Sequence, residues 1–71
     1  MKGASLPKAR AAKSHLLKQM MTLLELRGIG IAILRHGYGV KVNLSRPTAA
    51  FIPAEIDGVP VIVEVLGEIR R

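Results

Sequence analysis

Hydrophobic residues near the N-terminus recur at the spacing of an amphipathic helix. Residues 7–27 consist mainly of alanine, leucine, lysine, methionine and glutamate, which are good helix formers. Pro7 suits the first turn of a helix, and Gly28 suits the position just beyond its end. The pattern therefore predicts one long helix over 7–27. Its apolar stripe would consist of Ala9, Ala12, Leu16, Met20 and Leu23.

The next two segments have the pattern of a β-hairpin. Residues 29–35 are apolar at nearly every position, and residues 38–44 alternate apolar with polar. A two-residue turn at His36 and Gly37 would place the large apolar side chains of both strands on one face, so the turn and the pattern agree on the register. The predicted pairs are Ile33 with Val40, Ile31 with Val42 and Ile29 with Leu44.

A third strand is predicted at residues 59–66. Asp57 and Gly58 form a strong turn signal, since glycine tolerates positive φ and aspartate bonds to its own backbone. Valine occupies positions 59, 61, 63 and 65, which is typical of a strand with one buried face. Residues 45–58 connect the second and third strands. Pro47 and Pro53 exclude a long helix there, although 53–56 could form one helical turn.

These elements predict an α+β fold, with one N-terminal helix packed on a three-stranded, mainly antiparallel sheet. The first strand is apolar on both faces, which is typical of a central strand. The third strand is therefore expected beside the first, in the spatial order 2-1-3. We expect a flexible tail at residues 1–5 and a single domain at residues 6–71.

Composition limits the classes of protein that remain. With 71 residues, the chain has room for one domain with a small aliphatic core, and no cysteine is present to staple it. The absence of cysteine is compatible with a reducing compartment, and we expect a soluble, cytoplasmic protein without a membrane span.

A single helix can cover only one face of the predicted sheet. The other face would remain open, and a contiguous apolar patch on a small protein usually marks an interaction surface. Two charged residues would border this strip, which suits a weak or regulated contact with a protein partner or a second copy. Alternatively, their long side chains fold over the strip and nothing binds. The possible partner surface consists of Ala32, Leu34, Lys41, Ile62, Glu64 and Leu66.

The net charge of +6 keeps a second function open. A basic protein attracts polyanions, and nucleic-acid binding is the alternative hypothesis. Aromatic residues for stacking on single strands are almost lacking, because Tyr38 and Phe51 are the only two. Solubility of a small apolar domain explains the charge equally well. Possible polyanion contacts are Lys8, Arg10, Lys13, Lys18, Arg35 and Lys41.

No group of residues has the spacing of a catalytic or metal site. His15 lies on the predicted helix outside the apolar stripe, where a solvated histidine is expected, and His36 lies in the predicted turn. Glu55 and Asp57 are the nearest pair of acids, but Asp57 is explained by the turn. We therefore expect no enzyme, no cofactor and no metal.

The motif Ile-Pro-Ala-Glu-Ile-Asp-Gly-Val-Pro-Val at residues 52–61 carries a resemblance to a known kind of segment. Together with a Gly-Ile-Gly-Ile strand and Val-Lys-Val in the hairpin, it makes residues 28–66 similar to a segment found ahead of trypsin-like serine peptidase domains in some bacterial proteins. The resemblance includes no catalytic part of the peptidase. It implies a fold and an accessory or pro-segment ancestry, and it assigns no site residue.

Overall fold

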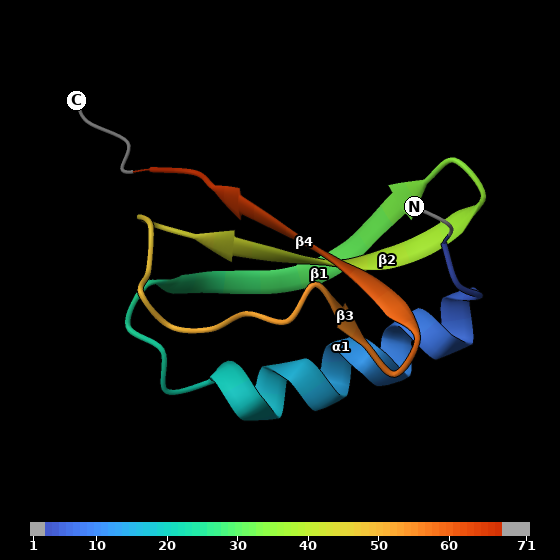
Figure 1. Cartoon of the computed structure of the whole chain (residues 1–71), viewed down its shortest axis with the longest axis horizontal. Helices are drawn as coiled ribbons and strands as arrows, with labels where there is room; N and C mark the ends of the chain where they lie inside the picture. The colour runs from blue at the N-terminus through green and yellow to red at the C-terminus, as the bar shows by residue number, and fades with distance from the viewer. Residues whose placement is uncertain (1–2, 68–71) are drawn as a thin grey trace.

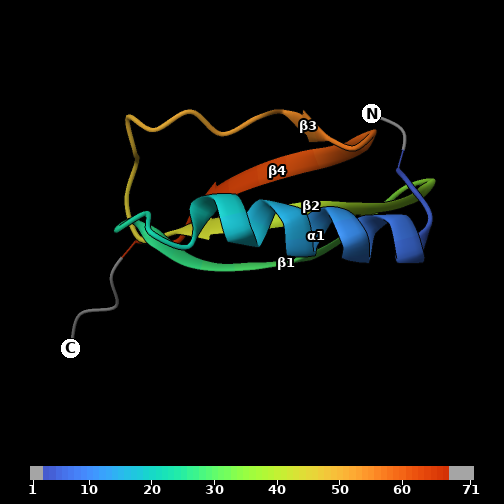
Figure 2. The ribbon, with the colours of Figure 1, turned by 90° about the horizontal axis from the view of Figure 1, so that it is seen from below.

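The fold consists of one helix packed against one face of a four-stranded mixed sheet (Figure 1, Figure 2). It is seen in a computed structural model that describes residues 3–67. The α+β prediction is confirmed, but the prediction of three strands is wrong. The elements are α1 (Leu6–Met20), β1 (Leu26–Leu34), β2 (Gly37–Leu44), β3 (Glu55–Ile56) and β4 (Val59–Val65).

Helix α1 begins as the sequence indicates and ends earlier than predicted. The Ser5 side chain caps the helix by accepting a hydrogen bond from the Lys8 amide at 3.4 Å. The helix stops at Met20, and residues 21–25 form turns that lead into β1 at Leu26. Leu26 pairs with Leu44, and the Glu25 carbonyl accepts a hydrogen bond from the Ser45 amide at 2.8 Å. Tertiary pairing thus outweighs the helix propensity of residues 21–27.

Strands β1 and β2 form the predicted antiparallel hairpin in a different register. Ile31 lies opposite Val40 and Ile29 opposite Val42, a shift of two residues from the prediction. The turn consists of Arg35 and His36 instead of His36 and Gly37. Because side chains alternate with a period of two, this shift leaves every residue on its predicted face.

The predicted strand order is wrong. The order is β1-β2-β4-β3, so β4 lies beside β2 and runs parallel to it, and β1 is an edge strand. The apolar character of β1 on both faces came from glycine and alanine as much as from isoleucine, and small residues do not require burial. β2 is the strand with a neighbour on each edge, β1 and β4, and its helix-facing residues Val40 and Val42 are fully buried.

The turn at Asp57 and Gly58 is confirmed, but the residues before it differ from the expectation. Both turn residues have positive φ, 52° and 76°, as a two-residue hairpin turn of the tight primed type requires. The turn joins β4 to β3, where Ile56 lies opposite Val59. Residues 55–56 are therefore a short strand, whereas a helical turn was considered possible at 53–56.

The core lies between α1 and the middle of the sheet. Ile33, Val63 and Val65 were expected in it, but they are 85%, 45% and 46% exposed. Figure 2 shows that α1 runs along β1 and β2, and Figure 1 shows that the end of β4 and the far end of the hairpin diverge from the helix. The buried cluster consists of Ala9, Ala12, Leu16, Met20, Val40, Val42, Leu44, Ile56, Val59 and Val61.

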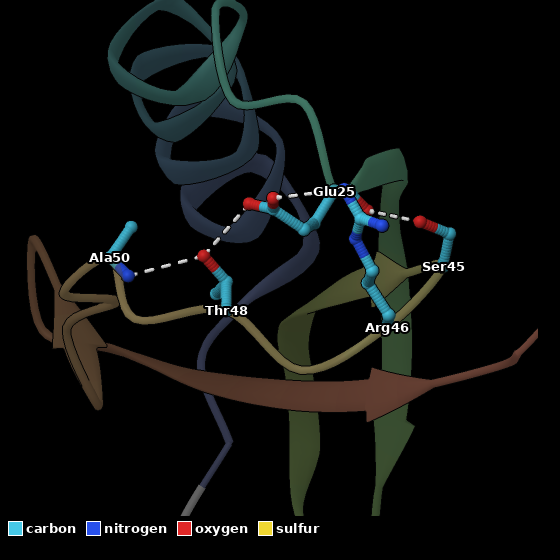
Figure 3. Close-up of polar contacts among 5 residues, drawn as sticks. All are labelled: Glu25, Ser45, Arg46, Thr48 and Ala50. Carbon is cyan, nitrogen blue, oxygen red and sulfur yellow. Dashed lines mark hydrogen bonds and ion pairs between the residues drawn. The ribbon is translucent and has the colours of Figure 1, made fainter.

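A polar cluster attaches the connection between β2 and β3 to the loop that follows α1 (Figure 3). The Glu25 carboxylate accepts a hydrogen bond from the Thr48 hydroxyl at 2.9 Å, and this hydroxyl accepts one from the Ala50 amide at 3.1 Å. Arg46 lies 3.8 Å from the second carboxylate oxygen of Glu25. The Glu25 side chain is only 18% exposed. These contacts give an otherwise irregular segment a fixed path.

The segment before α1 also belongs to the sheet. Ala4 forms a two-hydrogen-bond bridge with Tyr38, at 2.7 and 2.8 Å. Residues 1–5 were expected to form a flexible tail. Residues 1–2 lie outside the described residues, and Ala4 pairs with β2 just before the first pair between β2 and β4, Val40 with Val61. Among residues 3–67, no helix is both long and apolar enough to cross a membrane.

Candidate functional site

The sheet face opposite α1 carries the predicted partner surface. Ala32, Leu34, Lys41, Ile62 and Glu64 line one shallow hollow of about 460 Å³, and Leu66 lies outside it, just beyond β4. We call this surface, from Ala32 on β1 to Leu66, the open face. Ile62 and Leu66 are 36% and 53% exposed, whereas Ala32 is buried by its neighbours in the sheet. The apolar strip is therefore formed mainly by Leu34, Ile62 and Leu66.

An ion pair crosses the open face. Lys41 on β2 and Glu64 on β4 approach to 2.7 Å, with both side chains more than a third exposed. The pair forms because β2 and β4 are neighbours, with Lys41 opposite Ile62 and Asn43 opposite Glu64. Such a pair contributes under about 1 kcal/mol to stability, so its main effect is to neutralise two charges beside Ile62.

A buried acceptor lies next to this ion pair. Asn43 is on the open face between Gly28 on β1 and Glu64 on β4. Its side-chain oxygen is buried, and no group within the described residues donates a hydrogen bond to it. Buried acceptors are normally satisfied, and each exception calls for an explanation. Sequence reasoning did not single out this residue, because an asparagine at a polar strand position is ordinary.

The predicted polyanion contacts are not gathered on one surface. Lys8 and Lys13 lie on opposite flanks of α1 and Lys18 on its outer side, as their helical spacing requires. Lys41 lies on the other face of the sheet and is paired with Glu64. Arg35 belongs to the β1–β2 turn and Arg10 to the first half of α1.

His15 has a partner that the sequence did not indicate. Its Nδ1 donates to the Asp57 carboxylate at 3.0 Å, and the Gln19 amide donates to its Nε2 at 3.1 Å. The pair joins α1 to the β3–β4 turn across 42 positions of sequence, a distance at which no local pattern would reveal it. Both side chains are about half exposed, at 50% and 55%.

The hollow beside this pair contains carboxylates but, among the described residues, no hydroxyl or thiol side chain. This second hollow, of about 440 Å³, is lined by Gln19, Phe51, Glu55 and Asp57 together with apolar residues. A histidine–aspartate pair needs a group to activate before it can perform nucleophilic catalysis. The geometry therefore fits a surface contact that holds α1 against the β3–β4 turn. His36 is exposed in the β1–β2 turn.

We predict that the His15–Asp57 pair has little effect on stability. Contacts between exposed polar side chains, whether ion pairs or hydrogen bonds, typically contribute about 1 kcal/mol or less. A double-mutant cycle with His15→Gln and Asp57→Asn, followed by urea unfolding and circular dichroism, should give a coupling energy below about 1 kcal/mol. Asparagine at position 57 keeps the positive φ favourable, so the turn itself is not changed. A coupling of several kcal/mol would show that the pair is more than a surface contact.

Comparison of the chain with protein-family models, curated proteins and solved structures gives no match. The resemblance to segments that precede peptidase domains therefore stays a prediction from the motif at residues 52–61.

Proposed function

We propose that this domain is a non-enzymatic interaction module that binds a protein partner through the open face. The observation that carries the proposal is the composition of that face: exposed apolar side chains surround a neutralised ion pair. A protein surface that buries Ile62 and Leu66 would remove apolar area from water. An accessory role beside a larger protein fits the resemblance of residues 52–61.

A protein partner fits the open face better than a nucleic acid does. Lys41 is the cation on this face among those predicted to contact polyanions, and Glu64 neutralises it. Phosphate binding requires several unpaired cations on one surface. The nucleic-acid alternative therefore depends on α1, where the lysines point in different directions.

The test places a photo-crosslinking amino acid, p-benzoylphenylalanine, at position 62 of the full chain in the cells that produce it. We expect an adduct of defined mass from position 62 and none from position 51. Phe51 is a matched control because it is 87% exposed and borders the hollow beside α1. An adduct of twice the chain mass would identify a second copy as the partner.

The decisive measurement uses the purified partner. We predict that Ile62→Lys weakens its binding at least about 100-fold, because a buried unpaired charge costs several kcal/mol. Phe51→Lys should leave the affinity unchanged, and both variants should keep the parent circular dichroism spectrum. Equal affinities for the two variants, or no adduct specific to position 62, would overturn the proposal. Retention of nucleic acid that decreases steeply with salt would favour the alternative.

A further inference from the structure

Strand β1 has an outer edge that nothing within residues 3–67 pairs with. It is the first strand in the sheet order, and Figure 2 shows no described segment beyond it. The strand has nine residues, and residues 28–34 carry no charge. Natural proteins usually protect such an edge with charges, proline or a covering segment, because it can pair with another chain.

The hairpin register shows which backbone groups face this edge. Tyr38 uses its amide and carbonyl to bond Ala4, so these groups point away from β1. Ile33, opposite Tyr38, is therefore in a non-hydrogen-bonded pair, and its own amide and carbonyl point outward. By the alternation of an antiparallel ladder, Ile31 and Ile29 also present their backbone groups to the outer edge.

We infer that a second copy of this chain pairs with β1 in antiparallel fashion, about a two-fold axis at Ile31, to give one continuous eight-stranded sheet. Under this symmetry Ile31 faces its equivalent, and Ile29 faces Ile33 of the other copy. The outward backbone groups of these residues then pair with one another. The inference concerns the edge of β1, which shares Ala32 and Leu34 with the open face, and it does not depend on the proposed function.

The side chains of β1 are complementary to themselves in this register. On the open face, Gly28 of one copy lies opposite Leu34 of the other, and Gly30 lies opposite Ala32. Each larger side chain thus meets a glycine. Gly28 has room for this contact, because a Cβ at that position would meet no atom within 4 Å in its own chain. A self-matching edge of this kind favours a second copy over an unrelated peptide.

The flank of α1 extends the same surface above the strand. His15 and Lys8 lie on the flank that meets the β3–β4 turn, where His15 bonds Asp57 and the Lys8 amine approaches Gly58. Helical spacing places Leu17 on the opposite flank, the one that faces the β1 side, with Met21 following just past the helix end. These two side chains are 43% and 70% exposed, and Ile33 in the strand is 85% exposed. A peptide added to the edge alone would leave the helix flank uncovered.

The surface is large enough for a dimer of moderate affinity. Nine residues of strand extend over about 30 Å, and the sheet and helix layers are each about 10 Å deep. A contact over this strip would bury roughly 600 Å² on each copy, or about 1,200 Å² in total, the lower limit of standard interfaces.

The distribution of charge predicts how this dimer responds to salt. Arg10 and Lys13 lie on the same flank as Leu17, and each chain carries a net charge of +6. The register also brings Arg27 of one copy toward Arg35 of the other. The Arg27 guanidinium donates a hydrogen bond to the Gly67 carbonyl at 3.4 Å, which moves its charge away from the contact. Salt screens such repulsion, so the dimer should become stronger as salt is added. Binding to a polyanion would become weaker.

The test is sedimentation equilibrium of the full chain up to about 1 mM, in low and high salt, with matched variants. We expect a monomer–dimer equilibrium whose Kd decreases several-fold at high salt. Ile33→Lys and Leu17→Lys should each weaken it at least about 100-fold by placing a charge in the contact. Phe51→Lys and Ile62→Lys should leave it unchanged, which separates this dimer from the contact at the open face. In mixed-labelled NMR samples, Ile29 should show contacts to Ile33 of the other copy.

Gly28→Val tests the register itself. Valine fits the monomer at this position but occupies the space of Leu34 from the second copy, so we expect at least tenfold weaker pairing, although the variant is more apolar. An unchanged Kd for Gly28→Val would overturn the axis at Ile31. A parent that stays monomeric, or a dimer that survives both lysine variants, would overturn the inference as a whole.

Discussion

Leu16→Ala is expected to remove a large part of the stability of this domain. Leu16 is fully buried and packs in the cluster that contains Val40, Val42 and Leu44. Truncating a buried leucine costs about 2–5 kcal/mol, from lost transfer energy and from the cavity left behind. The free energy of unfolding of a 71-residue chain is about 4–11 kcal/mol in total. A loss of about 3 kcal/mol should lower the Tm by roughly 12–24 °C, as measured by circular dichroism at 222 nm.

The matched control is Leu24→Ala, which makes the same chemical change at a leucine that is 88% exposed. Exposed substitutions usually stay within about 0.5 kcal/mol of the parent, so its Tm should hardly move. If the two variants melted at similar temperatures, the contact between α1 and the sheet would not be the core of the protein.

From the sequence, the buried face of each element was predicted more accurately than the strands that lie next to it in the sheet. The apolar stripe of α1 and the alternation in β2 depend on local periodicity, so their buried residues could be assigned correctly. A shift of two residues in the β1–β2 register kept those faces, which is why the error did not affect the core. The position of β4 depended on pairing between segments far apart in the chain. Lys41 and Glu64 offered a signal, since opposite charges on one face of neighbouring strands attract each other.

The contacts that sequence reasoning missed all join distant segments. Glu25 interacts with residues 45–48, and His15 reaches Asp57 across most of the chain. Each of these residues has an ordinary role in its local context, as a helix residue or a turn residue. The open face was predictable because one helix can cover only one side of a sheet. The free edge of β1 could not be predicted in the same way, because it depends on the strand order, which was predicted wrongly.

Gly37→Ala should be nearly as destabilising as the core substitution, for a reason unrelated to burial of apolar area. Gly37 opens β2 with φ of 138°, a conformation that residues with a side chain rarely adopt. A Cβ there would lie 2.7 Å from the Ala4 carbonyl oxygen and 2.9 Å from the Gly3 carbonyl carbon. These are backbone atoms, which cannot rotate away as a side chain can. We expect a loss of about 3 kcal/mol, of which about 1–2 kcal/mol arises from backbone strain alone.

Two comparisons separate the strain from the clash. Gly58→Ala introduces a side chain at φ of 76°, where its nearest neighbour is the mobile Lys8 amine at 3.7 Å, so it should cost only about 1–2 kcal/mol. In a chain shortened to begin at Ser5, Gly37→Ala should cost about as much as Gly58→Ala, because Gly3 and Ala4 are gone. The four proteins to compare are the full chain and the shortened chain, each with and without Gly37→Ala. Their free energies of unfolding in urea give the coupling between the substitution and the removed segment directly. If the cost of Gly37→Ala were the same in both chains, the segment before α1 would not press against β2, and the Ala4–Tyr38 bridge would not exist in solution.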